Sequence, residues 1–323
     1  MFDLLIRGER VVTPQDIAAA MPLLAAAYDE PFGNSSAVPS FYCASLAAAD
    51  GVELLLAGDG GDELFAGNSR YVQQLTLEAY QRLPQGLRRH LLEPLLANSS
   101  WPGRVPLVRK AASYVKQART PLPDRLEAWN HFVRTPPQSI LHPEFLARVD
   151  AGAPLALLRR VYDRSSAGDA VDRMLELDWQ QTLADNDLRK VVRTCELAGV
   201  NVRFPMLDDE LAAFSTRVPA TFKIRGLRLR DFYRRACRGL LPEATLRKRK
   251  HGFALPFGVW MTENEQLRAI GRQSLAAFRT RRWIREDYLD ELVSRHGSEH
   301  AAYYGELIWV LVMLEQWLQS HGL

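Results

Sequence analysis

Apolar and polar positions in the first eighty residues predict alternating strands and helices. Residues 2–12 are typical of a strand, and Thr13 and Pro14 then open a helix, since a hydroxyl before proline caps a first turn. Proline and glycine near position 32 predict a loop, and Ser35-Ser36 can cap a second helix through Leu46. The short apolar run 52–57 predicts a buried parallel strand. This order indicates an α/β layer over residues 1–80.

Beyond position 80 long helical patterns dominate, with breaks at 98–103 and 120–123 and no further predicted strand. We therefore expect residues 81–323 to be mainly helical. The fold class is then α/β, with a partial parallel sheet followed by a mostly helical region. One strand–helix–strand unit makes a poor sheet, because sheets usually have about four to six strands. The rest of the sheet is expected upstream or from a partner chain.

Composition predicts a folded, soluble, cytoplasmic protein. The 323 residues are 47% hydrophobic and 24% charged, and a net charge of +3 is too small to imply a nucleic-acid partner. Three scattered cysteines argue against a disulfide framework and form no C-x-x-C pair. The N-terminus lacks a signal-peptide pattern, and the longest apolar run, 307–314, is far shorter than the roughly 18 residues that suggest a membrane span.

The sharpest chemical feature is the loop after the 52–57 strand. Its sequence from Gly58 to Gly67 is G-D-G-G-D-E-L-F-A-G. Ligands bind at the carboxyl ends of strands in open α/β sheets, glycines let backbone N–H groups approach an anion, and paired acids hold Mg²⁺. A calcium-like turn or a solvated acidic loop explains the same residues, so the loop alone leaves both interpretations open.

Four segments resemble the asparagine synthetase family. The loop, with Arg70-Tyr71 after it, resembles the G-D-G-G-D-E-L-F-x-G-Y signature, and residues 28–39 (Y-D-E-P-F-G-N-S-S-A-V-P) resemble D-E-P-F-x-D-S-S-x-x-P. Residues 202–208 (V-R-F-P-M-L-D) resemble V-R-x-P-F-L-D, and 249–256 (R-K-H-G-F-A-L-P) resemble K-Q-G-F-x-x-P. The resemblance covers most of the chain and implies an ATP-pyrophosphatase (adenine nucleotide alpha hydrolase-like) fold.

The resemblance implies ATP-dependent amide formation through an acyl-adenylate, with ATP and Mg²⁺ as cofactors. Aspartate is the default carboxylate substrate, and ammonia displaces AMP. By motif position, Gly58, Asp59, Gly60 and Gly61 would bind the nucleotide, and Asp62 would bind Mg²⁺. Asp59 and Lys250 would be catalytic, because a metal and an ammonium group placed where negative charge develops lower the barrier. The alternative for Lys250 is a solvated residue in a basic stretch.

Several positions depart from the family pattern. The S-G-G-x-D-S pyrophosphate loop is not found, and Phe2 stands where a glutaminase domain would expose its cysteine. Ala57, Val192 and Asn201 replace a usual serine, aspartate and glutamate. We therefore expect a truncated synthetase domain that is incomplete alone, with a possible partner chain supplying the pyrophosphate loop and the glutaminase domain. The alternative is a catalytically inactive or split-enzyme binding or scaffold protein of the same fold.

Four other features favour structural roles. His296 to His300 matches the zinc-protease pattern H-x-x-E-H, but Gly297 and Ser298 predict a turn there. The basic run 223–250 has few aromatic residues and is expected to be a solvated helix face that partly serves polyphosphate. Residues 307–314 predict a buried core helix, and Cys195 a packed thiol.

Overall fold

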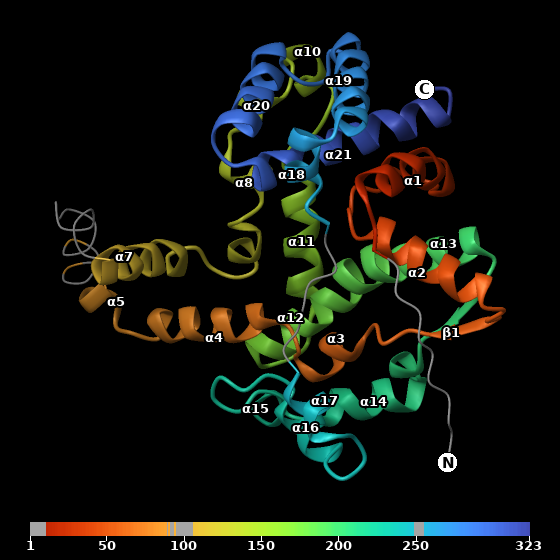
Figure 1. Ribbon diagram of the computed structural model, residues 1–323. Helices are drawn as coiled ribbons and strands as arrows, with labels where there is room; N and C mark the ends of the chain where they lie inside the picture. The colour runs from red at the N-terminus through yellow and green to blue at the C-terminus, as the bar shows by residue number, and fades with distance from the viewer. Residues whose placement is uncertain (1–10, 89, 91–93, 95–105, 249–254) are drawn as a thin grey trace.

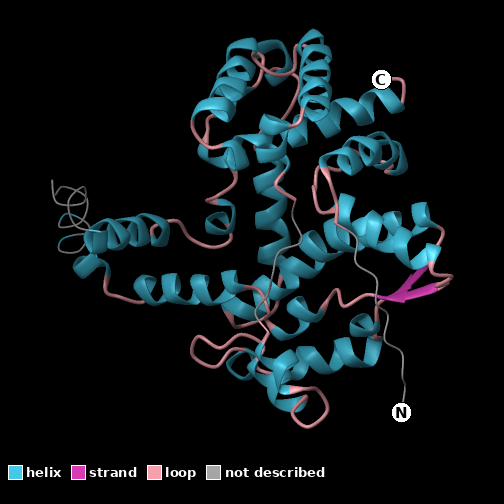
Figure 2. Ribbon diagram, in the orientation of Figure 1, coloured by secondary structure: helices cyan, strands magenta, loops and turns pink. Residues whose placement is uncertain are grey.

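Helices make up most of the described chain, and one small sheet lies beside them (Figures 1 and 2). The computed structural model describes residues 11–88, 90, 94, 106–248 and 255–323. Within these ranges the protein is mixed α/β, mostly helical, with a two-stranded parallel sheet. None of the helices described is both long and apolar enough to cross a membrane.

The two predicted N-terminal helices are present. In α1 (Pro14–Ala27) the Thr13 hydroxyl accepts from the Asp16 N–H, and the Asp16 carboxylate accepts from the Thr13 N–H at 2.8 Å, which forms a capping box. Helix α2 (Ala37–Ala49) begins after Ser36 as predicted and ends three residues beyond Leu46. The Ser36 hydroxyl, however, donates to Oδ1 of Asn34 at 2.6 Å and makes no helix cap.

The sheet corrects two sequence predictions. Strand β1 (Leu54–Leu56) pairs in parallel with β2 (Asn201–Arg203), in the region where no strand was expected. Three residues between a helix end and a proline are too few to show a strand period. Strand β1 is parallel, as predicted, but it is not buried, since Leu54 and Leu56 are 47% and 70% exposed. In the described chain β1 has one strand neighbour, β2. The strand predicted over 2–12 lies outside the described residues except for positions 11 and 12, which are not in a strand.

The middle of the chain is helical, as predicted. The break at 120–123 separates α7 from η2, and the break at 98–103 lies outside the described residues. The elements in this part are α3 (Gly61–Phe65), α4 (Ser69–Gln81), α5 (Gln85–Leu87), α7 (Pro106–Ala118), η2 (Asp124–Glu127), α8 (His131–Arg134), α9 (Pro137–Ile140), α10 (Pro143–Leu146), α11 (Ala153–Arg164), α12 (Ala170–Asp178), the π-helix η3 (Trp179–Leu188) and α13 (Arg189–Ala198).

The main core joins the two ends of the described chain. Buried side chains of α1 and α2 share one apolar cluster with those of the last four helices, and Figure 1 shows α1 beside α21. The predicted core helix at 307–314 is confirmed within α21, where Ile308, Trp309 and Val312 are almost fully buried. The elements after β2 are η4 (Pro205–Leu207), α14 (Asp209–Arg217), α15 (Ala220–Lys223), α16 (Asp231–Ala236), α17 (Glu243–Arg247), α18 (Phe257–Glu263), α19 (Glu265–Thr280), α20 (Glu286–Ser298) and α21 (Ala301–Ser320).

Helix α21 also holds the predicted loop near position 32. The Trp309 indole donates to the Gly33 carbonyl and the Trp317 indole to the Tyr28 carbonyl, both at 3.0 Å. The Tyr28 and Phe32 rings stack with centroids 4.4 Å apart. These contacts fix the segment that carries the D-E-P-F-like motif against the core.

The two histidines of the H-x-x-E-H pattern have structural roles. His296 is buried, with Nε2 2.7 Å from the Gly258 carbonyl oxygen, and His300 Nδ1 accepts from the Tyr303 N–H at the start of α21. The turn lies slightly later than predicted, because α20 continues through Ser298. The pattern is therefore a packed helix end followed by a helix cap.

Candidate active site

The glycine-rich loop turns sharply between β1 and α3. Gly60 has φ +92°, and a Cβ there would lie 2.2 Å from Cδ2 of Leu207, so only glycine fits both the conformation and the space. Gly58 differs, because a Cβ there would meet no atom within 4 Å. The backbone at Gly58 is therefore open to an approaching ligand, whereas Gly60 builds the turn that presents it.

A cavity of about 210 Å³ opens at this turn. Its lining includes Gly58, Asp59, Gly60 and Asp62, four of the five loop residues predicted to bind nucleotide or metal. Gly61 is not part of the lining. It is the first residue of α3, and a Cβ there would lie 3.5 Å from Cε of Met206. Glu63, with Leu183 and Asp187 from η3, completes the wall. The π-helix thus faces the loop across the cavity, and irregular helices of this kind are frequent at functional sites.

Asp59 has a perturbed carboxyl. Burial raises its pKa above the ordinary 3.8, nearby Lys190 lowers it, and the charge of Asp187 raises it. Loss of hydration disfavours the ionised form, so a cation brought to this carboxylate would be bound favourably. Carboxylates at 59 and 187 also supply the hard oxygen donors that Mg²⁺ prefers.

Lys190 and Asp187 are the site residues that sequence reasoning missed. The Lys190 ammonium donates to Oδ1 of Asp187 at 2.8 Å, and its side chain is only 14% exposed. The K-V-V-R segment was considered only for the departure at Val192, although it also carries this lysine. The described part of the site therefore contains a cation that is independent of Lys250.

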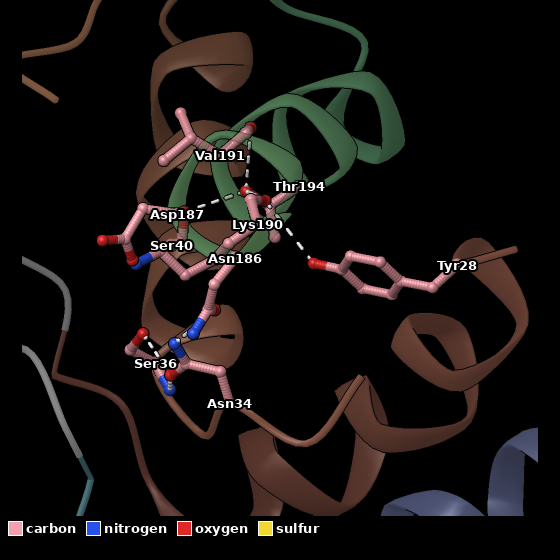
Figure 3. A network of polar contacts seen from close by, with 9 residues as sticks. All are labelled: Tyr28, Asn34, Ser36, Ser40, Asn186, Asp187, Lys190, Val191 and Thr194. Carbon is pink, nitrogen blue, oxygen red and sulfur yellow. Dashed lines mark hydrogen bonds and ion pairs between the residues drawn. The ribbon is translucent and has the colours of Figure 1, made fainter. Parts of the chain in front are cut away.

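A polar network joins the D-E-P-F-like segment to η3 and α13 (Figure 3). The Asn34 amide donates to Oδ1 of Asn186 at 3.0 Å, and the hydroxyls of Ser40 and Thr194 lie 2.8 Å apart. The Thr194 hydroxyl donates in turn to the Lys190 carbonyl at 2.8 Å. Two segments about 150 residues apart in sequence, at Asn34 and Asn186, are therefore held together by this hydrogen bond. Asn186 is the neighbour of Asp187, which lines the cavity.

A second, buried network anchors the other end of η3. Asp178 is 3% exposed and accepts from the Arg70 Nε at 3.0 Å and from the Tyr71 hydroxyl at 2.5 Å. The Arg70 guanidinium also donates to the Thr182 hydroxyl at 3.1 Å. Because Arg70 and Tyr71 follow the G-D-G-G-D-E loop directly, this network fixes the loop and the π-helix relative to one another.

The two remaining predictions stay predictions. Oδ1 of Asp62 lies 3.1 Å from Nε of Arg230, so the carboxyl proposed for Mg²⁺ is paired with a guanidinium in this structure. No group of three or more His, Cys, Asp or Glu side chains in the described ranges is arranged to hold a metal ion by itself. Lys250 lies outside the described residues.

Asp208 and Cys195 have structural roles. Asp208 caps α14 by accepting from the backbone N–H groups of Glu210 and Leu211, which is a structural turn. Cys195 is buried, and burial raises the pKa of its thiol, as expected for a packed residue. Lys223 departs from the expected solvated basic stretch, because it is only 4% exposed.

Sequence comparisons with known proteins identify the family of this chain. The sequence model of the asparagine synthase family matches residues 6–319. Asparagine synthetase (glutamine-hydrolysing) 1 of Bacillus subtilis is 24% identical over 95% of this chain and 46% of its own length. A Mycobacterium bovis protein provisionally named a glutamine-hydrolysing asparagine synthetase is 29% identical over 80% of this chain and 38% of its own. The chain thus spans less than half the length of these relatives, and with nearly all of its residues matched it belongs to the asparagine synthase family.

Proposed function

We propose that this chain is the synthetase part of an ATP-dependent amide-forming ligase, with an ATP-pyrophosphatase-type fold. In the proposed reaction ATP and a carboxylic acid, aspartate by default, give an acyl-adenylate and pyrophosphate, and ammonia then displaces AMP. The observation that supports this most is the cavity between the Gly58–Asp62 loop and η3, where an open glycine backbone meets Asp59 and Asp187, and where Lys190 pairs with Asp187. Its 210 Å³ is less than the roughly 300–1,000 Å³ of a whole small-molecule site, so it would enclose part of a nucleotide.

The roles proposed for the chain's residues follow from their charges. The open backbone at Gly58, with Gly60, would face the nucleotide, and Asp59 and Asp62 would face the metal. The nucleotide-binding role predicted for Gly61 has no support from the cavity lining. Bound Mg²⁺ would neutralise negative charge on the phosphates. Lys250 would hold a positive charge where pyrophosphate and the oxyanion develop, and Lys190 would add a second one beside Asp187. Asp62 would exchange its Arg230 contact for the metal on binding.

The partner chain and the cellular compartment are part of the same proposal. The family pattern includes a pyrophosphate loop and a glutaminase domain, and a partner chain or a longer form of this protein would supply both. All three cysteines are free in the structure, which suits a reducing cytoplasmic setting. We treat residues 1–80 as the α/β layer and 81–323 as the mainly helical part, with β2 returning to pair with β1.

A second candidate, a scaffold protein without ATP chemistry, is favoured by the ion pair between Asp62 and Arg230. If that pair is permanent, the proposed metal ligand is not free to bind Mg²⁺. The two candidates differ in whether the purified chain binds MgATP.

The experiment follows pyrophosphate release from the purified chain with ATP, Mg²⁺, aspartate and ammonia, and MgATP binding by calorimetry. The variants are Lys250→Ala and Asp62→Asn, with the exposed Lys116→Ala and Asp209→Asn as matched controls. The proposal predicts binding and release that both site variants lower at least tenfold and the controls leave unchanged. Absence of MgATP binding, even with the N-terminal part of the Bacillus subtilis relative added in trans, would favour the scaffold instead.

A further inference from the structure

Two short turns, one on either side of α16, share the sequence Arg-Gly-Leu. They are residues 225–227 and 238–240, and their glycines have positive φ, +61° at Gly226 and +80° at Gly239. A Cβ on either glycine would meet no atom within 4 Å, so the backbone of both turns is open to the surroundings. Figure 1 shows the loops before and after α16 at the lower edge of the molecule.

Each turn exposes its leucine. Leu227 is 71% exposed and Leu240 is 80% exposed, and the neighbouring Leu241 is 38% exposed. Apolar side chains exposed to this degree gain free energy when an apolar medium covers them. Helix α16 has six residues, so it separates the two turns by only about 9 Å. One surface can therefore contact both leucines at once.

The arginines of the two turns lack acidic partners. Within the part of the chain that the structure describes, the side chains of Arg225, Arg228 and Arg238 are exposed and form no ion pair. Arg230 nearby differs, because its Nε lies 3.1 Å from Oδ1 of Asp62. Uncompensated positive charge beside each exposed leucine favours an anionic partner.

A membrane surface with anionic lipids fits both features of these turns. Its headgroups attract arginine, which strengthens partitioning by about fivefold for each residue near the surface. Apolar side chains bury at the boundary between headgroups and acyl chains, while arginine side chains extend to the phosphates.

Other anionic partners fit less well. A nucleic acid offers phosphates but no apolar layer for the two leucines, and single strands are bound mainly by aromatic stacking. A protein partner would need a fitted pocket for each leucine, because the side chains that anchor protein interfaces fill such pockets. A fluid bilayer accepts two separate apolar tips without a complementary shape.

We propose that the two Arg-Gly-Leu turns form a docking surface for an anionic membrane. Leu227 and Leu240 insert at the level of the headgroups, and Arg225, Arg228 and Arg238 contact lipid phosphates. Only the turns enter the lipid layer, so no helix has to cross it. This docking is independent of the proposed reaction, because it uses residues outside the candidate active site.

Vesicle flotation of the full chain tests the proposal without ATP or substrates. Vesicles of equal parts phosphatidylglycerol and phosphatidylcholine are compared with vesicles of phosphatidylcholine alone. The salt is about 0.1 M or about 1 M NaCl, which sets Debye lengths of about 10 Å and 3 Å. We expect binding to the anionic vesicles alone, weakened at least tenfold at the higher salt concentration.

Two double variants identify the turns as the docking surface. Leu227→Ser with Leu240→Ser should weaken binding to the anionic vesicles at least tenfold, because apolar insertion is lost. Arg225→Gln with Arg228→Gln should weaken it at least tenfold as well, from about fivefold for each arginine. All four side chains are exposed, so thermal unfolding of both variants should match that of the unsubstituted chain.

Helix α11 supplies the matched controls. Leu157→Ser and Arg160→Gln, both exposed, should bind the vesicles like the unsubstituted chain. Binding that is lost in the arginine variant and kept in the leucine variant overturns the proposal, because a surface for a nucleic acid or another polyanion would behave in that way. Absence of binding to the anionic vesicles, or equal binding to phosphatidylcholine alone, overturns it too.

Discussion

The ammonium of Lys190 donates to Oδ1 of Asp187 at 2.8 Å, and Asp187 lines one cavity with Asp59. Lys190 thereby balances two carboxylates that would otherwise repel each other across the cavity, and it lowers the pKa of Asp59 against the effect of burial. Lys190 does not itself line the cavity, but its ammonium pairs with a carboxylate that does. A polyphosphate bound in the cavity would lie near this positive charge.

Replacement of Lys190 by glutamine tests whether this charge serves a ligand. Hydrogen bonds to charged groups are worth roughly 1.5–3 kcal/mol, so MgATP affinity should fall by about tenfold to a hundredfold. Calorimetric titration of Lys190→Gln measures the change, with the exposed Lys116→Gln as the matched control. Unchanged affinity in Lys190→Gln would show that the lysine only neutralises Asp187.

The glycines of the loop should respond differently to alanine. Gly60→Ala forces φ +92° on a residue with a Cβ and places that Cβ 2.2 Å from Leu207, so we expect a loss of about 1–3 kcal/mol. Gly58→Ala meets no neighbour within 4 Å and should change stability by less than about 0.5 kcal/mol while weakening MgATP binding. Urea unfolding and calorimetry separate the two effects. Equal destabilisation by both substitutions would contradict this division.

The sequence predicted what depends on neighbouring residues. The capping hydroxyl of Thr13 and the apolar helix around Trp309 follow from local patterns, and the structure contains both. The loop predicted from Gly58 to Gly67 is only partly a loop, because Gly61 to Phe65 form α3. Strand β2 was missed because three residues carry no period, and its pairing with β1 is a contact across about 150 residues.

The sequence predicted the residues of only one wall of the cavity. Four of the five loop residues predicted to bind line the cavity, because they are consecutive in sequence. Asp187 comes from the π-helix η3 and Lys190 from the start of α13, both more than a hundred residues from the loop. The network of Asp178 with Arg70 and Tyr71 holds the π-helix and the loop together. The contact between the loop and this distant segment follows from tertiary packing, so no local sequence pattern predicts it. The metal role of Asp62 and the catalytic role of Lys250 stay predictions.

The crossing of α18 and α21 depends on two glycines. A Cβ on Gly305 would lie 2.1 Å from Cα of Gly258, so Gly305→Ala should separate the helices and cost about 1–3 kcal/mol or more. Gly297 lies inside α20 with nothing within 4 Å, and Gly297→Ala should stabilise the protein by about 0.5–1 kcal/mol. Thermal unfolding of the Gly305→Ala and Gly297→Ala variants measures both changes in stability. A tolerated Gly305→Ala would mean that the helices do not pack this closely.

The half-buried carboxylate of Asp59 should lower the free energy of unfolding while it serves the proposed reaction. Its folded-state pKa is raised, mainly by burial, so the folded protein binds its proton more tightly than the unfolded chain does. The contribution of this group to stability therefore falls as pH rises from the ordinary value of 3.8 through the raised folded value, and the penalty persists at pH 7. Asp59→Asn removes the charge. We expect a gain of up to about 1 kcal/mol at pH 7 that vanishes in acid, together with loss of pyrophosphate release.

Urea unfolding of Asp59→Asn and the unsubstituted chain between pH 4 and pH 7 measures this effect, and the exposed Asp209→Asn serves as the control. The two stability curves should converge toward pH 4 and separate as the pH rises, because only the carboxylate form carries the penalty. A variant less stable than the unsubstituted chain at pH 7 would mean that attraction between Asp59 and Lys190 outweighs burial. The carboxylate would then be structural, and a cation would not be needed to stabilise it.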